Sequence, residues 1–299
     1  PCSTWTLRIT GALVRLTRAG TPEQRSAARA VLLSIGSLLA TELPNLANAG
    51  ESGQQTLLRL LTAMPDDIAA PHIARLAYDS TIPETLAWSL ADRLLELPVE
   101  ADSVPPGDPA ALARWAFVQA NRSSRTRQLL APHADEALSA LFTSSAGEGR
   151  RRRVANAILD DATLPLDAHL AAVKLLGDTR HPASSEVIER ALHDQSVEVQ
   201  RHAIDALAAQ PINKALNTLS RTIFDAHAPW EARMSALQHI TKHAGPEAND
   251  LLVSCVRNAE LPLYMRIHAV EALGNADANV AALLALAGDA QVHPELRIT

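Results

Sequence analysis

Apolar residues near the end of the chain recur with helical spacing, and the helices themselves recur. Four fourteen-residue segments align without gaps in residues 165–299, beginning at Pro165, Ser196, Pro229 and Pro262, in steps of 31, 33 and 33 residues. A partial fifth copy, HPELRIT, starts at His293. A period of this length is typical of stacked helical hairpins, each of which buries its apolar face against its neighbours.

The four copies share a pattern of apolar and polar positions. One column is alanine throughout, and apolar residues follow it one and four positions later, which places them on one helical face. The alanine column predicts close approach of a neighbouring helix, whereas the polar column two positions later predicts an exposed face. The alanines are Ala172, Ala203, Ala236 and Ala269, and the polar residues are Lys174, Asp205, Gln238 and Glu271.

A second helix is predicted in each copy, starting near Ser184, Asn213, Pro246 and Asn279. Each ends on a short polar residue that can hydrogen-bond to the backbone of the next turn: Asp194, Asp225, Asn258 and Asp289. We interpret Gly177, Gly274 and Gly245-Pro246 as signals that end one helix and begin the next.

The run VEVQRHAIDAL follows such a turn residue, and one first-helix position is basic in several copies. That position holds Arg233, Arg266 and Arg297, with Gln200 and His169 in the other copies. Residues 165–299 therefore resemble HEAT repeats, in particular the HEAT-like class named after phycobilisome lyases. The resemblance implies an all-α fold, a right-handed α-α superhelix, in which second helices line the concave side.

Residues 1–164 show the same pattern in a less regular form. Segments from Thr21 and Ile82 match the first helix, which places Ala28 and Ser89 in the alanine column. Further helices are predicted over 54–63, 67–78, 110–121, 134–142 and 150–159. The stretch PVEADSVPPGDP at 98–109 is interpreted as a loop inserted in one solenoid, and the alternative is a boundary between two helical domains.

The regular array, residues 165–299, stops early in its fifth copy. Because a helical array needs a polar capping repeat, we expect the native chain to continue past Thr299 as part of a larger protein.

The amino-acid composition favours a helical protein and argues against nucleic acid as its partner. Apolar residues make up 47% and aromatic residues 3%, which suits closely packed helices. A net charge of -6 makes nucleic acid an improbable partner, and no apolar run approaches 18 residues, so no membrane span is expected. Only three of 27 basic residues are lysine, a bias typical of GC-rich bacterial genomes, and we favour a cytoplasmic location.

Motifs that carry catalysis are missing from the sequence. It contains no HExxH or His-Glu dipeptide, no GxSxG, no Walker A loop and no GxGxxG. The pairs Asp66-Asp67 and Asp160-Asp161 fall near helix ends, where aspartate is common. Cys2 and Cys255 offer no disulfide framework, and Cys255 is expected to be buried in a helix. We therefore expect no catalytic residue, metal or cofactor, and a protein more suited to binding than to catalysis.

Two surfaces are candidates for binding. The polar residues of the second helices suit a protein or peptide partner: Glu186, Glu189, Arg190, Lys214, Asn217, Arg221, Asn249, Asp250 and Arg257. The segment 114–153 has eight arginines and a net charge of +5, with four arginines at a helix start, where the helix dipole disfavours cations. This indicates either a solvated face or an anion site formed by Arg122, Arg125, Arg127, Arg150, Arg151, Arg152 and Arg153.

The leading functional hypothesis is a non-enzymatic scaffold that mediates protein–protein interaction. The arginine segment leaves open a nucleic-acid-binding protein or a HEAT-like DNA glycosylase. The repeat class leaves open a protein associated with a tetrapyrrole lyase. A lipid-transfer role would need a broadly apolar concave face, and the second helices are too polar for that.

Overall fold

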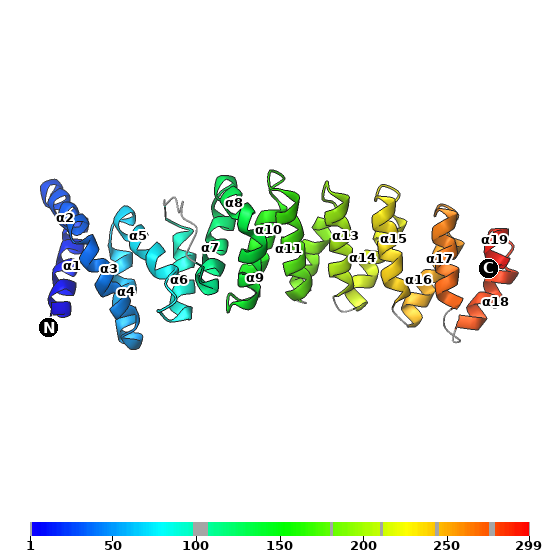
Figure 1. Cartoon of the computed structure of the whole chain (residues 1–299), viewed down its shortest axis with the longest axis horizontal. Helices are drawn as coiled ribbons and strands as arrows, with labels where there is room; N and C mark the ends of the chain where they lie inside the picture. Colours follow the sequence, from blue (N-terminus) through cyan, green and yellow to red (C-terminus); the bar gives the residue numbers. More distant parts are fainter. Residues whose placement is uncertain are drawn as a thin grey trace. The chain divides into compact units, whose positions relative to one another are not determined.

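The chain folds as an all-α helical solenoid, as predicted. The computed structural model describes residues 2–97, 107–179, 182–209, 212–242, 245–274 and 279–298, and these ranges contain helices and turns but no strand (Figure 1). Two compact units are present, Pro1–Ala168 (unit 1) and His169–Thr299 (unit 2). Most of the predicted loop at 98–109 lies outside the described residues.

Unit 1 is built from helices of uneven length. They are α1 (Cys2–Ala19), α2 (Pro22–Ser34), α3 (Gly36–Ala47), α4 (Gly50–Ala63), α5 (Asp66–Ala77), α6 (Glu84–Leu94), α7 (Pro109–Arg122), α8 (Ser124–Leu130), the 3-10 turn η1 (Ala131–His133), α9 (Ala134–Thr143) and α10 (Glu148–Leu159). The short α8 was not predicted; its start is fixed by a capping box between Ser123 and Thr126.

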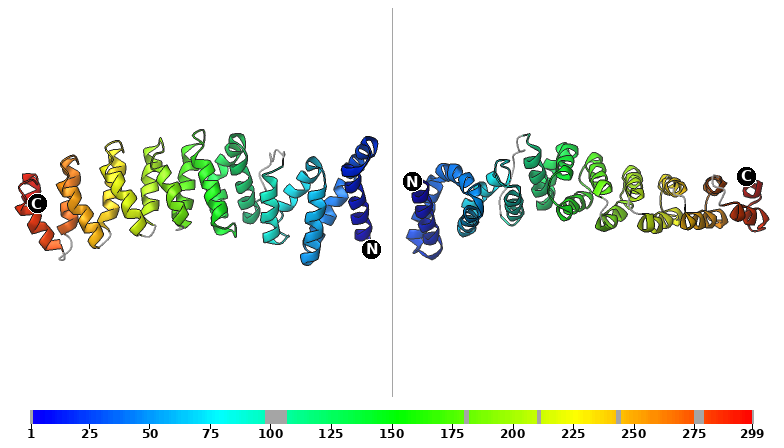
Figure 2. Two further views of the ribbon diagram at one scale, coloured as in Figure 1. Left: turned by 180° about the vertical axis from the view of Figure 1, so that it is seen from behind. Right: turned by 90° about the horizontal axis from the view of Figure 1, so that it is seen from below.

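Unit 2 alternates first and second helices. The first helices are α11 (Leu166–Thr179), whose start belongs to unit 1, α13 (Val197–Ala208), α15 (Trp230–Thr241), α17 (Leu263–Gly274) and α19 (Pro294–Ile298). The second helices are α12 (Pro182–Ala191), α14 (Ile212–Phe224), α16 (Pro246–Arg257) and α18 (Val280–Gly288). Seen from below, the two kinds lie in two rows, with α13, α15 and α17 consecutive in one of them (Figure 2).

The helical phase predicted for unit 2 is confirmed. All four residues of the alanine column are 0% exposed, and all four residues of the polar column are exposed. The core between the rows is aliphatic and includes Ile204, Leu219, Leu252 and Leu273. The alanine column therefore lets each first helix pack closely against its neighbours.

Gly177 does not end a helix, contrary to the prediction. Helix α11 continues past it to Thr179. A Cβ at position 177 would lie 2.9 Å from the Cβ of Ala206 in α13, closer than side-chain carbons pack. The glycine therefore permits two first helices to touch, which is a packing role. Pro246, by contrast, is the first residue of α16, as predicted. The residues after Gly274 lie outside the described part of the chain, so the signal at Gly274 stays a prediction.

Ser89 does not occupy the alanine column, so the alignment proposed for unit 1 was wrong by one position. Ser89 is exposed and its hydroxyl donates to the carbonyl of Thr85 at 3.0 Å. The neighbouring Leu90 is 1% exposed and fills the core instead. Ala28 and Leu32, by contrast, are buried as predicted.

One turn recurs in both units and explains the misalignment. An Asp or Asn side chain accepts the backbone N–H two residues later at 2.8–3.2 Å, at positions Asp79, Asp161, Asp194, Asp225, Asn258 and Asp289. Four of these turns had been predicted in unit 2. When the sequences are aligned on Asp79, Leu90 falls in the alanine column, so a larger residue replaces alanine in that repeat of unit 1.

Candidate binding surfaces

Arg114 of the arginine segment points into unit 1. It is 2% exposed, and its guanidinium donates from Nε to the carbonyl of Ala77 and from a terminal nitrogen to the carbonyl of Asp79 at 3.3 Å. Both carbonyls lie at the C-terminal end of α5, where the helix leaves its last acceptors without partners. Desolvation lowers the pKa of Arg114. This arginine therefore closes a helix end.

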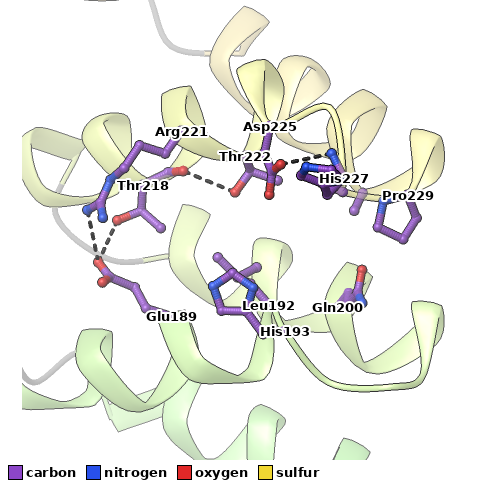
Figure 3. Close-up of a pocket in the computed structure, with 12 residues that line it drawn as sticks. Glu189, Leu192, His193, Gln200, Thr218, Arg221, Thr222, Asp225, His227 and Pro229 are labelled. Carbon is purple, nitrogen blue, oxygen red and sulfur yellow. Dashed lines mark hydrogen bonds and ion pairs between the residues drawn. The ribbon is translucent and has the colours of Figure 1, made fainter.

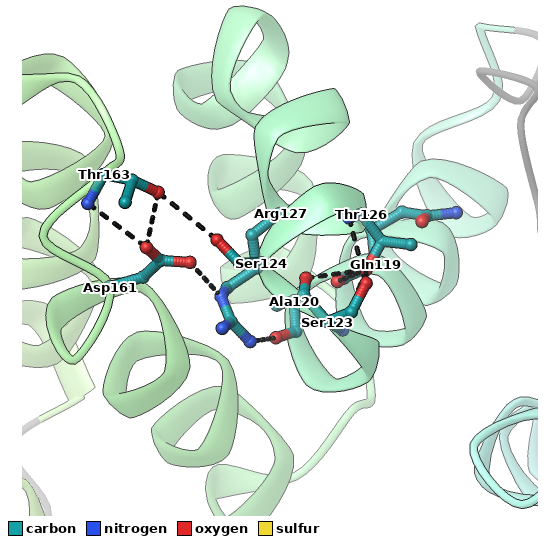
Figure 4. A network of polar contacts seen from close by, with 8 residues as sticks. All are labelled: Gln119, Ala120, Ser123, Ser124, Thr126, Arg127, Asp161 and Thr163. Carbon is teal, nitrogen blue, oxygen red and sulfur yellow. Dashed lines mark hydrogen bonds and ion pairs between the residues drawn. The ribbon is translucent and has the colours of Figure 1, made fainter.

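Arg122 and Arg127 make similar contacts. Arg122 donates to the carbonyls of Leu94 and Leu97 at 2.8 and 2.7 Å, at the end of α6. Arg127 donates to the carbonyl of Ala120 at 3.1 Å and to the carboxylate of Asp161 at 2.7 Å (Figure 4). Both arginines therefore have hydrogen-bond acceptors inside unit 1, and Arg127 also has a carboxylate partner there.

Asp161 is the anion of this network. It is 7% exposed and accepts from the Thr163 hydroxyl at 2.6 Å and from the Thr163 backbone at 3.2 Å, in addition to Arg127 (Figure 4). The Thr163 hydroxyl, followed by Arg127 and Ser124, holds the pKa of Asp161 well below its usual range. Asp161 is therefore a structural carboxylate, consistent with a helix-end role rather than a catalytic pair.

The four consecutive arginines differ in their surroundings. Arg150 forms an ion pair with Asp92 at 2.5 Å and lies over the Trp88 ring, 5.1 Å from its centroid. Arg151 donates to the carbonyl of Ser144 at 2.7 Å, beyond the end of α9. Arg152 is half-buried, whereas Arg153 is exposed, as is Arg125 on α8.

At least five of the eight arginines thus have structural acceptors in unit 1, and four of these use carbonyls at helix ends. These contacts account for much of the local excess of positive charge without an external anion. The anion site itself stays a prediction.

Unit 2 uses arginine in the same way, from one repeated position. The Nε atoms of Arg233 and Arg266 donate to the carbonyls of Ile223 and Val256 at 2.9 and 2.8 Å, each ten residues earlier in the chain. Gln200 holds this position in α13, and its Nε2 donates to the carbonyl of Asp194 at 2.7 Å. The basic column noticed in the sequence is therefore a column of donors to the preceding second helix and its turn.

The sequence-predicted residues on the second helices fall into several groups. Asn249 is hydrogen-bonded to the buried Asn279, with 2.6 Å between Nδ2 and Oδ1. Arg257 pairs with the turn residue Asp289 at 3.4 Å. Arg190, Asn217 and Asp250 are exposed on α12, α14 and α16. The side chains of Glu186 and Lys214 lie outside the described residues.

Glu189 and Arg221, the remaining two, come together at a groove between α12 and α14 (Figure 3). The groove has a volume of about 550 Å³ and extends to the turns that follow both helices. Its polar lining includes Gln200, Thr218 and Asp225, and its apolar lining is Leu192, Ala228, Pro229 and Ala232. Sequence reasoning missed most of these residues because the turns contribute as much as the helices.

Gln200 has one atom without a partner at this groove. The side chain is 8% exposed, and its Oε1 is buried with no hydrogen-bond donor in reach. The bond from Nε2 to the Asp194 carbonyl fixes which end of the amide is oxygen, since the reversed amide would set two acceptors against each other. An unpartnered buried acceptor is uncommon, because its desolvation is not offset.

The hydroxyl protons of the groove are already in use. Thr218 donates to Glu189 at 2.5 Å, and Thr222 donates to the Thr218 carbonyl at 3.0 Å. Asp225 accepts the backbone N–H of His227 at 2.8 Å, which occupies one of its several lone-pair sites. Arg221 lies at the edge, with its side chain 74% exposed and 4.0 Å from Glu189. Besides the Arg221 guanidinium at its edge and the rings of His193 and His227, the groove presents acceptors to a ligand, namely the carboxylates of Glu189 and Asp225 and Oε1 of Gln200.

Across the described ranges, no three His, Cys, Asp or Glu side chains are placed to bind a metal ion. His169 is buried and hydrogen-bonded to Asp194 at 3.0 Å, while His202 contacts the carbonyl of Glu198 at 2.9 Å. Cys255 is buried as predicted, and desolvation raises the pKa of its thiol to about 12. That thiol therefore stays protonated at neutral pH.

In the described part of the chain, no single helix is both long and apolar enough to cross a bilayer. The two helices α2 and α3 pass the test only together, and they are bent by 72° relative to each other.

Comparison with known proteins adds little. No family model and no curated protein matches the chain. Among solved structures, the designed armadillo repeat protein YIII(Dq)4CqI matches with 16% identity, 88% coverage of this chain, 98% of the other and a TM-score of 0.29. A structure of computationally designed armadillo repeat proteins for modular peptide recognition matches with 16% identity, 96% and 94% coverage and a TM-score of 0.21. Superpositions this loose carry no argument about ligands.

Proposed function

We propose that this helical-repeat protein is a non-catalytic scaffold of the HEAT-like class, and that the second-helix side of unit 2 binds a protein or peptide. The groove between α12 and α14 carries this proposal. It combines a volume of about 550 Å³, an apolar lining and convergent polar groups, which are the usual attributes of a binding site. Glu189 and Arg221 were expected on this surface from the sequence alone.

The character of the groove favours binding over catalysis. Glu189 accepts from the Thr218 hydroxyl, Thr222 donates to a backbone carbonyl, and Asp225 accepts the backbone N–H of His227. Within the part of the chain that the structure describes, no hydroxyl of the groove is hydrogen-bonded to a histidine ring, as an activated nucleophile would be. No contact among the described residues supports the tetrapyrrole-lyase hypothesis or the nucleic-acid hypothesis. We also propose that the regular array begins at residue 165.

The proposal is tested by selecting peptides from a random displayed library on the purified chain. Selected peptides should bind the wild-type protein and should bind a Glu189→Ala, Arg221→Ala double variant about tenfold more weakly or worse, as titration calorimetry would show. These two side chains face the groove and are at least one-third exposed, so their loss should leave the fold intact.

The matched control changes the same residue types on the first helix of the neighbouring repeat. Glu198 and Arg201 are exposed on α13, so the Glu198→Ala, Arg201→Ala double variant should bind the selected peptides as the wild type does. A library that yields no binder, or binders equally weakened by both double variants, contradicts the proposal.

A further inference from the structure

We infer that the groove between α12 and α14 binds an arginine side chain of the partner. This inference deepens the proposed function and rests on it. It follows from two features of the groove: two carboxylates in its lining, and Gln200, which is both an unpartnered buried acceptor and a departure from the arginines of its repeat column.

The unpartnered acceptor is Oε1 of Gln200. The residue is only 8% exposed, and it lines the groove on the side of Pro229 (Figure 3). A ligand that donates an N–H to this oxygen removes the desolvation cost of an unsatisfied acceptor. A ligand that brings only acceptors gains nothing there.

The carboxylates of the groove also accept hydrogen bonds, so they favour a ligand that supplies N–H donors. Glu189 and Asp225 supply carboxylates, and the hydroxyls of Thr218 and Thr222 have already donated their protons. A guanidinium carries five N–H donors and no acceptor, so it matches such a lining better than a neutral or anionic group does. The alkyl stem of an arginine can pack on Leu192 and Pro229.

Charge also favours a cation. Residues 169–299 contain 15 acidic and 11 basic side chains, which gives a formal charge of -4. The basic Arg221 is at the solvent-facing edge of the groove. A cationic ligand is therefore attracted at long range and meets carboxylates at close range.

The departure from the repeat pattern is Gln200 itself. The equivalent residues Arg233 and Arg266 are cations that donate to a carbonyl. Gln200 donates with Nε2 to the carbonyl of Asp194, a turn residue six positions earlier, and has an unpartnered acceptor, Oε1, in place of the further donors of a guanidinium. The exchange of arginine for glutamine converts this position from one that repels a cation to one that accepts it.

The first experiment compares two capped tripeptides, Ac-Gly-Arg-Gly-NH2 and Ac-Gly-Cit-Gly-NH2, in which citrulline is a neutral isostere of arginine. Binding is followed by NMR through the side-chain amide signal of Gln200. We expect the arginine peptide to shift this signal and to bind about tenfold more tightly than the citrulline peptide, since hydrogen bonds to charged groups are the stronger ones. Equal shifts by the two peptides, or none by either, overturn the inference.

The second experiment removes charge without disturbing the turn. Asn258 forms the same turn as Asp225, so Asp225→Asn should keep the fold and weaken binding of the arginine peptide about tenfold. Asp289→Asn makes the same change in a turn outside the groove and should leave binding unchanged. Gln200→Arg, which restores the repeat pattern, should abolish arginine binding while the circular dichroism spectrum stays helical. Unaltered binding in both Asp225→Asn and Gln200→Arg contradicts the inference.

Failure here is distinguishable from failure of the proposed function. If displayed peptides lose affinity on the Glu189→Ala, Arg221→Ala variant but bind equally well after their arginines are replaced by citrulline, the groove is a peptide site that does not select arginine.

Discussion

Units 1 and 2 both use arginine side chains to donate hydrogen bonds to the carbonyls at helix ends, but the arginines reach these carbonyls over different distances along the chain. In unit 2, Arg233 and Arg266 occupy one repeat position and donate to carbonyls ten residues earlier, so that α15 and α17 each close the end of the second helix before them. In unit 1, Arg114 and Arg122 reach carbonyls 25 to 37 residues earlier, from positions with no common register. The repeat has decayed in unit 1, yet the requirement for donors at helix ends remains.

The comparison changes how an arginine-rich segment should be interpreted. The last carbonyls of a helix lack intrahelical donors and carry partial negative charge. A chain of many short helices has many such ends, and arginine reaches them with several donors at once. A local excess of arginine can therefore reflect internal demand in a helical repeat protein.

The largest expected effect concerns Arg114. Arg114→Ala removes the donor of the buried Ala77 carbonyl and of the half-buried Asp79 carbonyl and creates a cavity, so we expect it to lower the free energy of unfolding by about 3–5 kcal/mol in urea denaturation. Arg266→Ala in unit 2 removes a donor from one carbonyl and should cost about 1–3 kcal/mol. If Arg266→Ala proves the more damaging, the irregular unit does not depend on its arginines as we argue.

A medium effect is expected at the alanine column of unit 2. Ala203→Leu or Ala236→Leu should destabilise by about 1–3 kcal/mol, because a larger side chain overpacks the contact between first helices. Lys174→Ala and Gln238→Ala, on the exposed column, should stay within about 0.5 kcal/mol of the wild type. Urea melts that show the same loss at both columns would mean that the helical phase is wrong.

The next effect is a pH-dependent loss of stability, and it distinguishes Asp161 from Asp225, which forms the same turn in unit 2. The pKa of Asp161 is lowered on folding, so its ionised form stabilises the fold at pH values above the unfolded-state pKa of 3.8. That contribution is lost as the pH falls below about 4 toward the lower folded-state value. We expect Asp161→Asn to cost about 1–3 kcal/mol at pH 7 and progressively less on acidification, as thermal melts across pH would show.

The control for that experiment is Asp225→Asn. Both positions form the same turn, but Asp161 alone of the two has an arginine within hydrogen-bonding distance among the contacts described. The control should therefore lose less stability at pH 7. An Asp161→Asn penalty that persists unchanged at pH 2 would contradict the ionic explanation.

The smallest expected effect lies within the run of four arginines. Arg151 donates to the Ser144 carbonyl, so Arg151→Gln should cost about 1 kcal/mol. The adjacent substitution Arg152→Gln should change the free energy of unfolding by no more than about 0.5 kcal/mol. Chemical denaturation of the two single variants measures this difference, and equal costs would show that sequence neighbours are not distinguished by their acceptors.

Sequence alone predicted the regular part of the fold, because there the periodicity is repeated in register. The alanine column and the Asp or Asn turns followed from comparing four copies. It misplaced Ser89 because a single degraded copy offers no second sequence to fix the register, although the Asp79 turn would have done so. It misread Gly177 because a glycine that permits close packing and one that ends a helix look the same in a sequence.

The candidate site was less accessible to prediction. Helical phase placed Glu189 and Arg221 on one surface, but Gln200 and Asp225 join them from a different helix and from a turn. Their convergence depends on the packing of two hairpins, which no single helical pattern encodes. The only advance signal was Gln200 itself, where a basic column becomes neutral.

The bond between Arg150 and Asp92 has a consequence for how the chain reaches its native state. It joins residues 58 positions apart, whereas inter-hairpin bonds in unit 2, such as those from Asn249 and His239, span 30 and 34. Folding slows as the sequence separation of native contacts grows, since a longer loop must close before the contact forms. The contacts of unit 2 can therefore form one hairpin at a time, while the Arg150–Asp92 contact of unit 1 forms only after a longer loop between α6 and α10 has closed. In a refolding experiment the C-terminal unit should acquire its protected amides first.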